Sequence, residues 1–202
     1  MYIPEHFRIR DEQVLRQFAA SNSFGMLITQ GADGLIASHL PMLLEGEKLV
    51  AHLARANPQA RDIEAGISAL AIFHGPHAYV SPSWYSDPEH SVPTWNYSAV
   101  HITGRPQVIS EATAVKELLQ RLVSQFESGK ENPWGFDLES PDIDNLIRGI
   151  VAFEMPIETM EGKFKLSQNR PIGDRGRVMW SLKSSESQMD QQVAEMMRDV
   201  LT

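Results

Sequence analysis

The aromatic and histidine side chains of this chain concentrate between residues 73 and 104. This stretch holds two of the four tryptophans and four of the seven histidines, and its prolines prevent a continuous helix. After Pro93, an alternating strand pattern would place Trp95 and Tyr97 on one face and Asn96 on the other. An aromatic loop that leads into such a strand suits a planar, hydrogen-bonding ligand. The alternative is a loop that only packs over the open end of a barrel.

A second candidate site is the segment from His52 to Arg61, which reads HLARANPQAR. Asn57 followed by Pro58 is a strong helix start, where backbone N–H groups and the positive end of the helix dipole favour an anion. Donor side chains surround this start: Arg55, Asn57, Gln59 and Arg61, with Ser38 and His39 on an adjacent strand. Together they would hold a phosphate group. The alternative is a capped helix start that binds only water, because no glycine-rich phosphate loop is present.

A third segment, residues 163–170, reads KFKLSQNR and alternates basic and amide side chains with two apolar ones. In an extended conformation it would show two different faces. Such a segment could close over an anionic ligand. The alternative is a solvated tail.

Metal binding and hydrolysis have little support in the sequence. His74 and His77 are separated by glycine and proline, so they cannot share one face of a helix, and no third ligand follows at a recognisable spacing. We therefore expect no metal site. Neither a Gly-x-Ser-x-Gly nor a Ser-x-x-Lys motif occurs, so no activated serine nucleophile is predicted.

The bulk properties narrow the classes of function further. A chain of 202 residues fits one domain with appendages, and the lack of cysteine excludes disulfides and thiolate metal sites. The N-terminus carries charges where a signal peptide is apolar, and no apolar run approaches the ~20 residues of a membrane-spanning helix. We therefore expect a cytoplasmic protein without membrane contact. A formal charge of −8 without a basic run disfavours direct DNA binding.

The elements that must position these residues follow from periodicity and turn residues. Predicted strands cover residues 24–29, 35–44, 48–53, 67–73, 93–109 and 149–157. Predicted helices cover residues 11–20, 58–65, 110–127, a short segment from 140 that ends at Gly149, and the end of the chain from 187. Several short strands with appended helices favour a mainly β, α+β fold built on a small antiparallel barrel. The apolar stripe of helix 110–127 is expected to pack in the core or against a second subunit.

Several motifs, in order along residues 1–170, resemble the PaiB-like family, described as FMN-binding negative transcriptional regulators. They are MYIPEHF, SHLPMLLE, HLARANPQ, GPHAYVSPSWY, VPTWNYSAVHITG and KLSQNR. The resemblance implies an FMN-binding split β-barrel, similar to the pyridoxine-phosphate oxidase group. It also implies a homodimer with FMN in the cleft between the protomers. Residues 1–170 would form the split-barrel domain, and residues 171–202 a helical extension packed on that domain.

The resemblance assigns cofactor-binding roles by position. The phosphate and ribityl side would comprise Ser38, His39, His52, Ala54, Arg55, Asn57, Gln59 and Arg61. The flavin ring would lie near Trp95, Asn96 and Tyr97, with Lys165, Gln168 and Asn169 from either protomer. The more distant oxidases hold the phosphate with Arg or Lys where this chain has His39 and Gln59, so Arg55 or Arg61 would substitute.

Two other functions fit the same pattern. The first is a flavin-dependent NAD(P)H oxidoreductase or flavin reductase. The second is a haem-binding split barrel, for which the candidate ligands are His39, His52, His74, His77 and His101. DNA is a possible partner by the family resemblance, although the net charge disfavours it.

Overall fold

The computed structural model describes residues 1–201, without the side chains of Pro141, Val200 and Leu201. Thr202, the last residue of the predicted extension, lies outside the described residues. The described part contains eight antiparallel strands and six α-helices, so the prediction of a mainly β fold with appended helices is confirmed. None of the helices in this part is both long and apolar enough to cross a bilayer.

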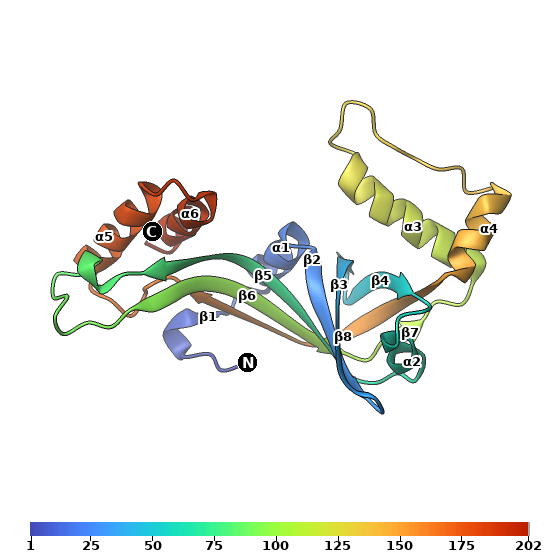
Figure 1. Cartoon of the computed structure of the whole chain (residues 1–202), viewed down its shortest axis with the longest axis horizontal. Helices are drawn as coiled ribbons and strands as arrows, with labels where there is room; N and C mark the ends of the chain where they lie inside the picture. Colours follow the sequence, from blue (N-terminus) through green and yellow to red (C-terminus); the bar gives the residue numbers. More distant parts are fainter. Residues whose placement is uncertain (202) are drawn as a thin grey trace. The chain divides into compact units, whose positions relative to one another are not determined.

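The chain forms two compact units, which we describe separately. The first unit comprises residues 1–18, 74–100 and 161–202, and the second comprises residues 19–73 and 101–160. Three long strands supply residues to both: β5 (Ala69–Val80), β6 (Thr94–Gly104) and β8 (Ile150–Lys165). Strands β5 and β6 lie side by side in the sheet (Figure 1).

A meander of three strands opens the second unit: β2 (Phe24–Gly31), β3 (Gly34–Glu45) and β4 (Lys48–Ala54). The other edge of β2 pairs with residues 69–72 of β5, and β4 pairs with the first half of β8. Strand β7 (Gln107–Val108) pairs with β8, which also pairs with β6. The chain therefore returns to its own sheet, as a small barrel requires.

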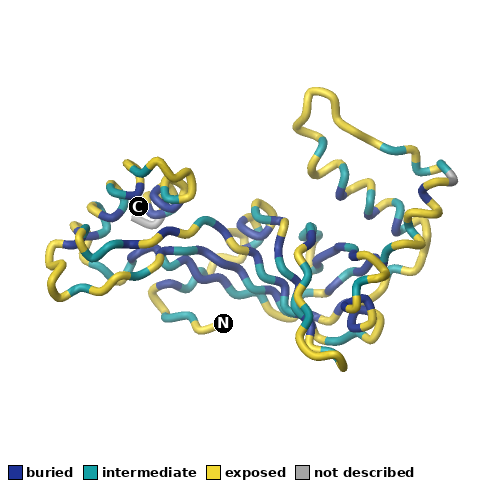
Figure 2. Tube along the Cα trace, in the orientation of Figure 1, coloured by how far each residue is buried: buried dark blue, intermediate teal, exposed yellow. Residues whose placement is uncertain are grey.

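Helices cover this sheet in the way that the sequence predicts. Val115, Leu118 and Leu122 of α3 (Ala112–Glu127) are buried against Val50 and Ala152 of the sheet. This part of the predicted stripe is thus core packing, whereas Phe126 at the end of the stripe is 47% exposed. Helix α4 (Pro141–Arg148) starts at the capping hydroxyl of Ser140, and α3 and α4 are joined by a connection that is exposed along most of its length (Figure 2).

The first unit combines the N-terminal and C-terminal segments with the ends of the long strands. A 3-10 turn η1 (Glu5–Phe7) leads into β1 (Arg8–Ile9), which pairs with Gly162 and Lys163 of β8, and then into helix α1 (Glu12–Ser21). Gly162 is required there, because a Cβ would lie 2.1 Å from the Leu15 Cδ2 atom. Helices α5 (Ile172–Lys183) and α6 (Gln188–Leu201) pack on each other (Figure 1), and the two helices bury Val178, Leu182, Val193 and Met197.

Three boundaries differ from the sequence predictions. Strand β5 continues to Val80 rather than ending at residue 73, and β8 continues to Lys165. Pro76 is tolerated in β5 because β2 pairs only with residues 69–72, so no ladder bond to β2 is lost. The predicted strand 93–109 is broken into β6 and β7 at Arg105-Pro106, where proline cannot donate a ladder hydrogen bond.

A buried polar network fastens helix α2 (Gln59–Glu64) to strand β2. The Gln59 Nε2 donates to the carbonyls of Leu27 (3.0 Å) and Ile36 (3.2 Å) and to the Thr29 hydroxyl (3.1 Å). The Thr29 hydroxyl donates to an Asp62 carboxylate oxygen at 2.5 Å. A Cβ on Gly31 would lie 1.8 Å from Asp62, so only glycine allows the helix this close approach.

Thr29→Val should lower the free energy of unfolding by about 1–3 kcal/mol, because it leaves the buried Asp62 carboxylate and Gln59 amide without the hydroxyl between them. Thr159→Val is the matched control, since its hydroxyl pair with Thr103 is exposed. It should change the free energy by less than about 0.5 kcal/mol. Chemical denaturation of both variants measures this difference, and equal effects would remove the network's proposed role.

Candidate functional site

Exposed aromatic rings gather on one face of β5 and β6 in the first unit. Trp95 is 53% exposed and Tyr79 46% exposed, and their ring centroids lie 5.9 Å apart in a T-shaped contact. The His77 ring lies 6.1 Å from Trp95, and the His74 ring 5.0 Å from His77. Tyr97 follows Trp95 by two residues and so faces the same side of the strand. We call these five residues the aromatic face.

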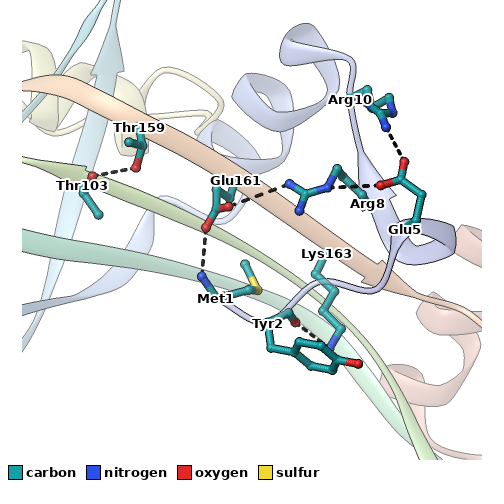
Figure 3. Close-up of polar contacts among 9 residues, drawn as sticks. All are labelled: Met1, Tyr2, Glu5, Arg8, Arg10, Thr103, Thr159, Glu161 and Lys163. Carbon is teal, nitrogen blue, oxygen red and sulfur yellow. Dashed lines mark hydrogen bonds and ion pairs between the residues drawn. The ribbon is translucent and has the colours of Figure 1, made fainter.

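A buried cation borders the aromatic face. Lys163 on β8 is only 8% exposed, and its Nζ lies 5.3 Å from the Tyr97 ring centroid and 5.6 Å from that of Tyr2. The same ammonium donates to the Tyr2 carbonyl at 3.2 Å (Figure 3). Glu161 holds the N-terminal segment in place, because it pairs with the Met1 ammonium at 2.8 Å and with Arg8 at 3.8 Å (Figure 3).

Lys165, two residues further along β8, contacts the backbone of Trp95 directly. Its Nζ donates to the Trp95 carbonyl and to the Thr94 hydroxyl, both at 2.6 Å. Partial burial lowers the pKa of Lys165, and the nearby charges of Lys163 and Arg170 lower it further. An ammonium that is desolvated and crowded by other cations would be stabilised by a bound anion. The aromatic face therefore has exposed rings next to a lysine whose ammonium a bound anion would stabilise.

The other residues predicted near the flavin ring have partners inside the protein. Asn96 is fully buried on the opposite face of β6, where its amide donates to the Ser167 hydroxyl at 3.0 Å. Gln168 folds back on its own segment, donating to the Phe164 carbonyl and accepting from the Leu166 N–H. Asn169 is exposed beside them. Asn96 and Gln168 thus shape the turn after β8, while Trp95 and Tyr97 face the other side of β6.

In the second unit, the predicted helix start has the expected local geometry. The Asn57 side-chain oxygen accepts from the Gln59 N–H at 2.9 Å, and its amide donates to the Ser38 hydroxyl at 2.8 Å. These two bonds link β3 to the start of α2. Gln59 itself is fully buried in the network with Thr29, so its amide has a structural role.

The two arginines of this segment are committed to contacts within the second unit. The Arg55 guanidinium donates to the carbonyls of Arg148 (3.0 Å) and Ile150 (2.8 Å) and pairs with Glu64 at 3.2 Å. Arg55 therefore ties the end of β4 to the start of β8. Arg61 is exposed and pairs with Asp33 at 3.4 Å. Each of the two guanidinium groups therefore already has a carboxylate partner.

Two histidines of this unit, His39 and His52, lie on the neighbouring strands β3 and β4, and His101 lies on β6. His39 is exposed on β3, with its ring stacked near Phe24, while Ala54 is exposed at the end of β4. His52 is half-buried on β4, and its Nδ1 is buried without a hydrogen-bond partner in the described part of the chain. Burial lowers the pKa of His52, so the neutral ring is favoured. A neutral imidazole with one unused nitrogen can accept from, or donate to, a bound polar group.

Comparison with known proteins identifies the family. A family model described as "Putative FMN-binding domain" matches residues 1–159. The chain is 37% identical over 206 residues to the "Protease synthase and sporulation protein PAI 2" of Bacillus subtilis, covering 100% of this chain and 98% of the relative. The chain belongs to the PaiB-like, FMN-binding family. An uncharacterized protein of Saccharomyces cerevisiae is 32% identical over 166 residues, covering 69% of this chain and 97% of the yeast protein.

Solved structures confirm the predicted split-barrel fold of this PaiB-like chain. The FAD and heme binding protein from Mycobacterium smegmatis matches with a TM-score of 0.63 at 15% identity, over 78% of this chain and 73% of that one. The flavocytochrome Anf3 from Azotobacter vinelandii also matches with a TM-score of 0.63, at 12% identity, over 81% of this chain and 72% of that one. Membership of this FMN-binding family makes the chain a flavin-binding protein.

Sequence reasoning missed part of the aromatic face. Tyr79 and His77 were expected in a loop, whereas β5 extends through both and brings them to Trp95. Lys163 belonged to a recognised basic segment, but its cation–π contacts depend on Tyr2, which lies 161 residues away along the chain. The period-two spacing of Lys163 and Lys165 was the one local signal available. Among residues 1–201, no group of three or more histidine, aspartate or glutamate side chains is arranged to hold a metal ion.

His52 should make the stability of the protein depend on pH. Because burial lowers its pKa, the unfolded chain binds a proton more readily than the folded protein. The free energy of unfolding should therefore fall as the pH drops below about 6.5, the ordinary histidine pKa, and level off below the lowered folded-state pKa. His52→Gln should flatten this part of the pH profile in denaturation series between pH 8 and pH 4.

His74, whose pKa is also lowered, first by burial and then by His77, provides the comparison for this experiment. His74→Gln should remove a separate part of the slope, and the double variant should be flatter than either single variant. An unchanged slope in His52→Gln would show that the His52 ring is protonated equally well in the folded protein.

Proposed function

We propose that this chain binds FMN, with the isoalloxazine ring on the aromatic face of the first unit. The observation that supports this most directly is the exposed indole of Trp95, a residue whose backbone carbonyl accepts from Lys165, an ammonium that is partly desolvated and near other cations. A planar, electron-poor ring with hydrogen-bond acceptors at its polar edge fits both features. When bound, FMN supplies a ring that accepts and releases electrons or hydride.

The residues of the aromatic face have distinct roles in this proposal. Trp95 and Tyr97 provide the stacking surface, and Lys165 donates toward the polar edge of the ring. Lys163 holds the Tyr97 and Tyr2 rings in place through cation–π contacts. Asn96, Gln168 and Asn169 act on the turn that carries Lys165 rather than on the ring itself.

Phosphate binding in the second unit is a separate proposal. Its leading residues are Ser38, His52 and Asn57. Ser38 and His52 lie on the neighbouring strands β3 and β4, and Asn57 lies just before the start of α2. The His52 Nδ1 has no hydrogen-bond partner in the described part of the chain, and the Asn57 amide donates to the Ser38 hydroxyl. His39 and the exposed backbone at Ala54 are further candidates. Arg55 and Arg61 would have to leave Glu64 and Asp33 to take part, which makes them weaker candidates.

We also propose that the protein is a homodimer, as the PaiB-like resemblance implies. An exposed tryptophan and tyrosine in contact on one sheet face are unusual on a surface that meets only water, and they support a face that is covered in the working protein. Light scattering of the purified protein measures the molar mass directly. Whether the flavin also serves NAD(P)H oxidation stays a prediction.

Trp95→Ala should weaken FMN binding about tenfold or more, because a stacked aromatic ring contributes about 1–3 kcal/mol to the binding of a flat base. The fold should be retained, since the side chain is exposed. Trp134→Ala is the matched control, because Trp134 is 61% exposed and belongs to the second unit. Quenching of flavin fluorescence gives both affinities. Equal affinities for FMN would rule out the aromatic face as the ring site.

Comparing FMN with riboflavin tests the ring proposal and the phosphate proposal separately. Lys165→Gln should weaken both ligands by a similar factor of about ten, because a charged hydrogen-bond donor near the ring is lost. The Ser38→Ala/His52→Gln double variant should weaken FMN only, because riboflavin has no phosphate. Lys183→Gln, a charge change on α5, is the control. If Lys165→Gln weakens FMN alone, Lys165 binds the phosphate and the assignment above is wrong.

A further inference from the structure

A pocket of about 510 Å³ lies on the first unit, and its lining includes none of the five residues of the aromatic face. It opens between helix α5 and the 3-10 turn η2 (Pro82–Trp84). The residues of its lining that matter here are Trp84, Tyr85, Gly173, Gly176, Arg177 and Trp180. The volume falls within the ~300–1,000 Å³ that small-molecule sites usually have.

The two glycines have no explanation inside the protein. Both lie within helix α5, where glycine is unfavourable compared with alanine. A Cβ on Gly176 would meet nothing within 4 Å, and one on Gly173 would meet only the end of the Arg177 side chain at 3.9 Å. Internal packing therefore does not require them. Glycine leaves the helix backbone bare, which allows an external group to approach closely.

Aromatic side chains form the walls of the pocket. Trp180 is 69% exposed. It follows Gly176 by four residues and therefore lies on the same face of α5. Trp84, half-buried, faces it from η2. An exposed indole beside a bare stretch of helix offers a flat ring both a stacking surface and room to enter.

Polar groups at the pocket are of two kinds. Tyr85 is 4% exposed, and its hydroxyl is buried without a hydrogen-bond partner in the described part of the chain. The Arg170 guanidinium lies 4.2 Å from the Tyr85 ring centroid and holds that ring in place. Arg177 supplies a cation at the rim, paired on one side with Asp174 at 2.5 Å. Guanidinium has further N–H donors for a second anion.

We propose that this pocket is a second ligand site, distinct from the flavin site, for a planar aromatic molecule that carries an anionic group. The ring stacks on Trp180 over the bare backbone at Gly173 and Gly176, and the anion binds Arg177. Nucleotides and aromatic carboxylic acids share this chemistry. The hydroxyl of Tyr85 pairs with a polar atom of the bound molecule or with a water that the molecule traps.

Calorimetric titration of the full chain, saturated with FMN, tests the proposal with AMP and indole-3-carboxylate as probes. Saturable binding of either supports it, and the tighter probe shows whether the site prefers a nucleotide or an aromatic acid. Adenosine should bind more weakly than AMP, since it lacks the anion. If neither probe binds, the proposal is wrong. If AMP binds only in the absence of FMN, the pocket belongs to the flavin site and the proposal also fails.

Three variants separate binding from structure. Trp180→Ala should weaken the bound probe about tenfold, as loss of a stacked ring does, while Trp134→Ala should not. Gly176→Ala should raise the midpoint of thermal unfolding through helix propensity and yet weaken binding, a combination that a purely structural role cannot produce. Tyr85→Phe should weaken binding without loss of stability, since it removes an unpaired buried hydroxyl.

The same variants distinguish the small-molecule site from a competing explanation, in which a second copy of the chain binds to α5. In that case Trp180→Ala would change the molar mass measured by light scattering, and neither probe would bind the wild-type protein. An unchanged molar mass together with weakened probe binding supports the small-molecule site. Because the titration is made with FMN already bound and measured independently, failure here leaves the flavin proposal untouched.

Discussion

The alternation of side chains along β6 is the constraint on which the candidate site depends. Asn96 points to the buried side, where its hydrogen bonds with Ser167 leave no freedom in the register of the strand. Trp95 and Tyr97 must then lie on the opposite side. A shift by one residue would bury the indole and expose the amide. The exposure of the Trp95 ring is therefore a consequence of the satisfied polar groups on the other face of β6.

The alternation of side chains along β8 likewise determines where its two lysines lie. Lys163 and Lys165 are two residues apart, so the strand holds both on one side although their charges repel. Lys163 is compensated by two aromatic rings and a carbonyl, and Lys165 by two oxygen acceptors next to Trp95. None of these partners carries a full negative charge. The positive potential is thus retained at the surface, and a bound anion is the remaining way to offset it.

Local patterns predicted the elements well and their polar partners poorly. Turn residues and side-chain periodicity are patterns among residues close together in the sequence. They predicted the meander, the capped start of α2 and the buried stripe of α3. Arg55 looked like a phosphate ligand, but its acceptors are carbonyls at residues 148 and 150. The extension of β5 through Pro76 likewise depends on where β2 stops pairing. Such partners, distant in the sequence, decide which hydrogen-bond donors remain for a ligand. They cannot be recognised from the residues next to the donor in the sequence.

Most buried polar side-chain atoms have hydrogen-bond partners within the fold, and a few do not. In the described part of the chain, three buried side-chain atoms lack a hydrogen-bond partner: His52 Nδ1, Gln59 Oε1 and the Tyr85 hydroxyl. Gln59 is otherwise fully engaged in fastening α2, so its unused oxygen is a local cost of that network. The other two atoms belong to His52, a candidate residue for the phosphate, and to Tyr85, which lines the α5 pocket. The His52 imidazole and the Tyr85 phenol have no comparable network of their own, and a bound ligand would give each polar atom a partner that the fold does not supply.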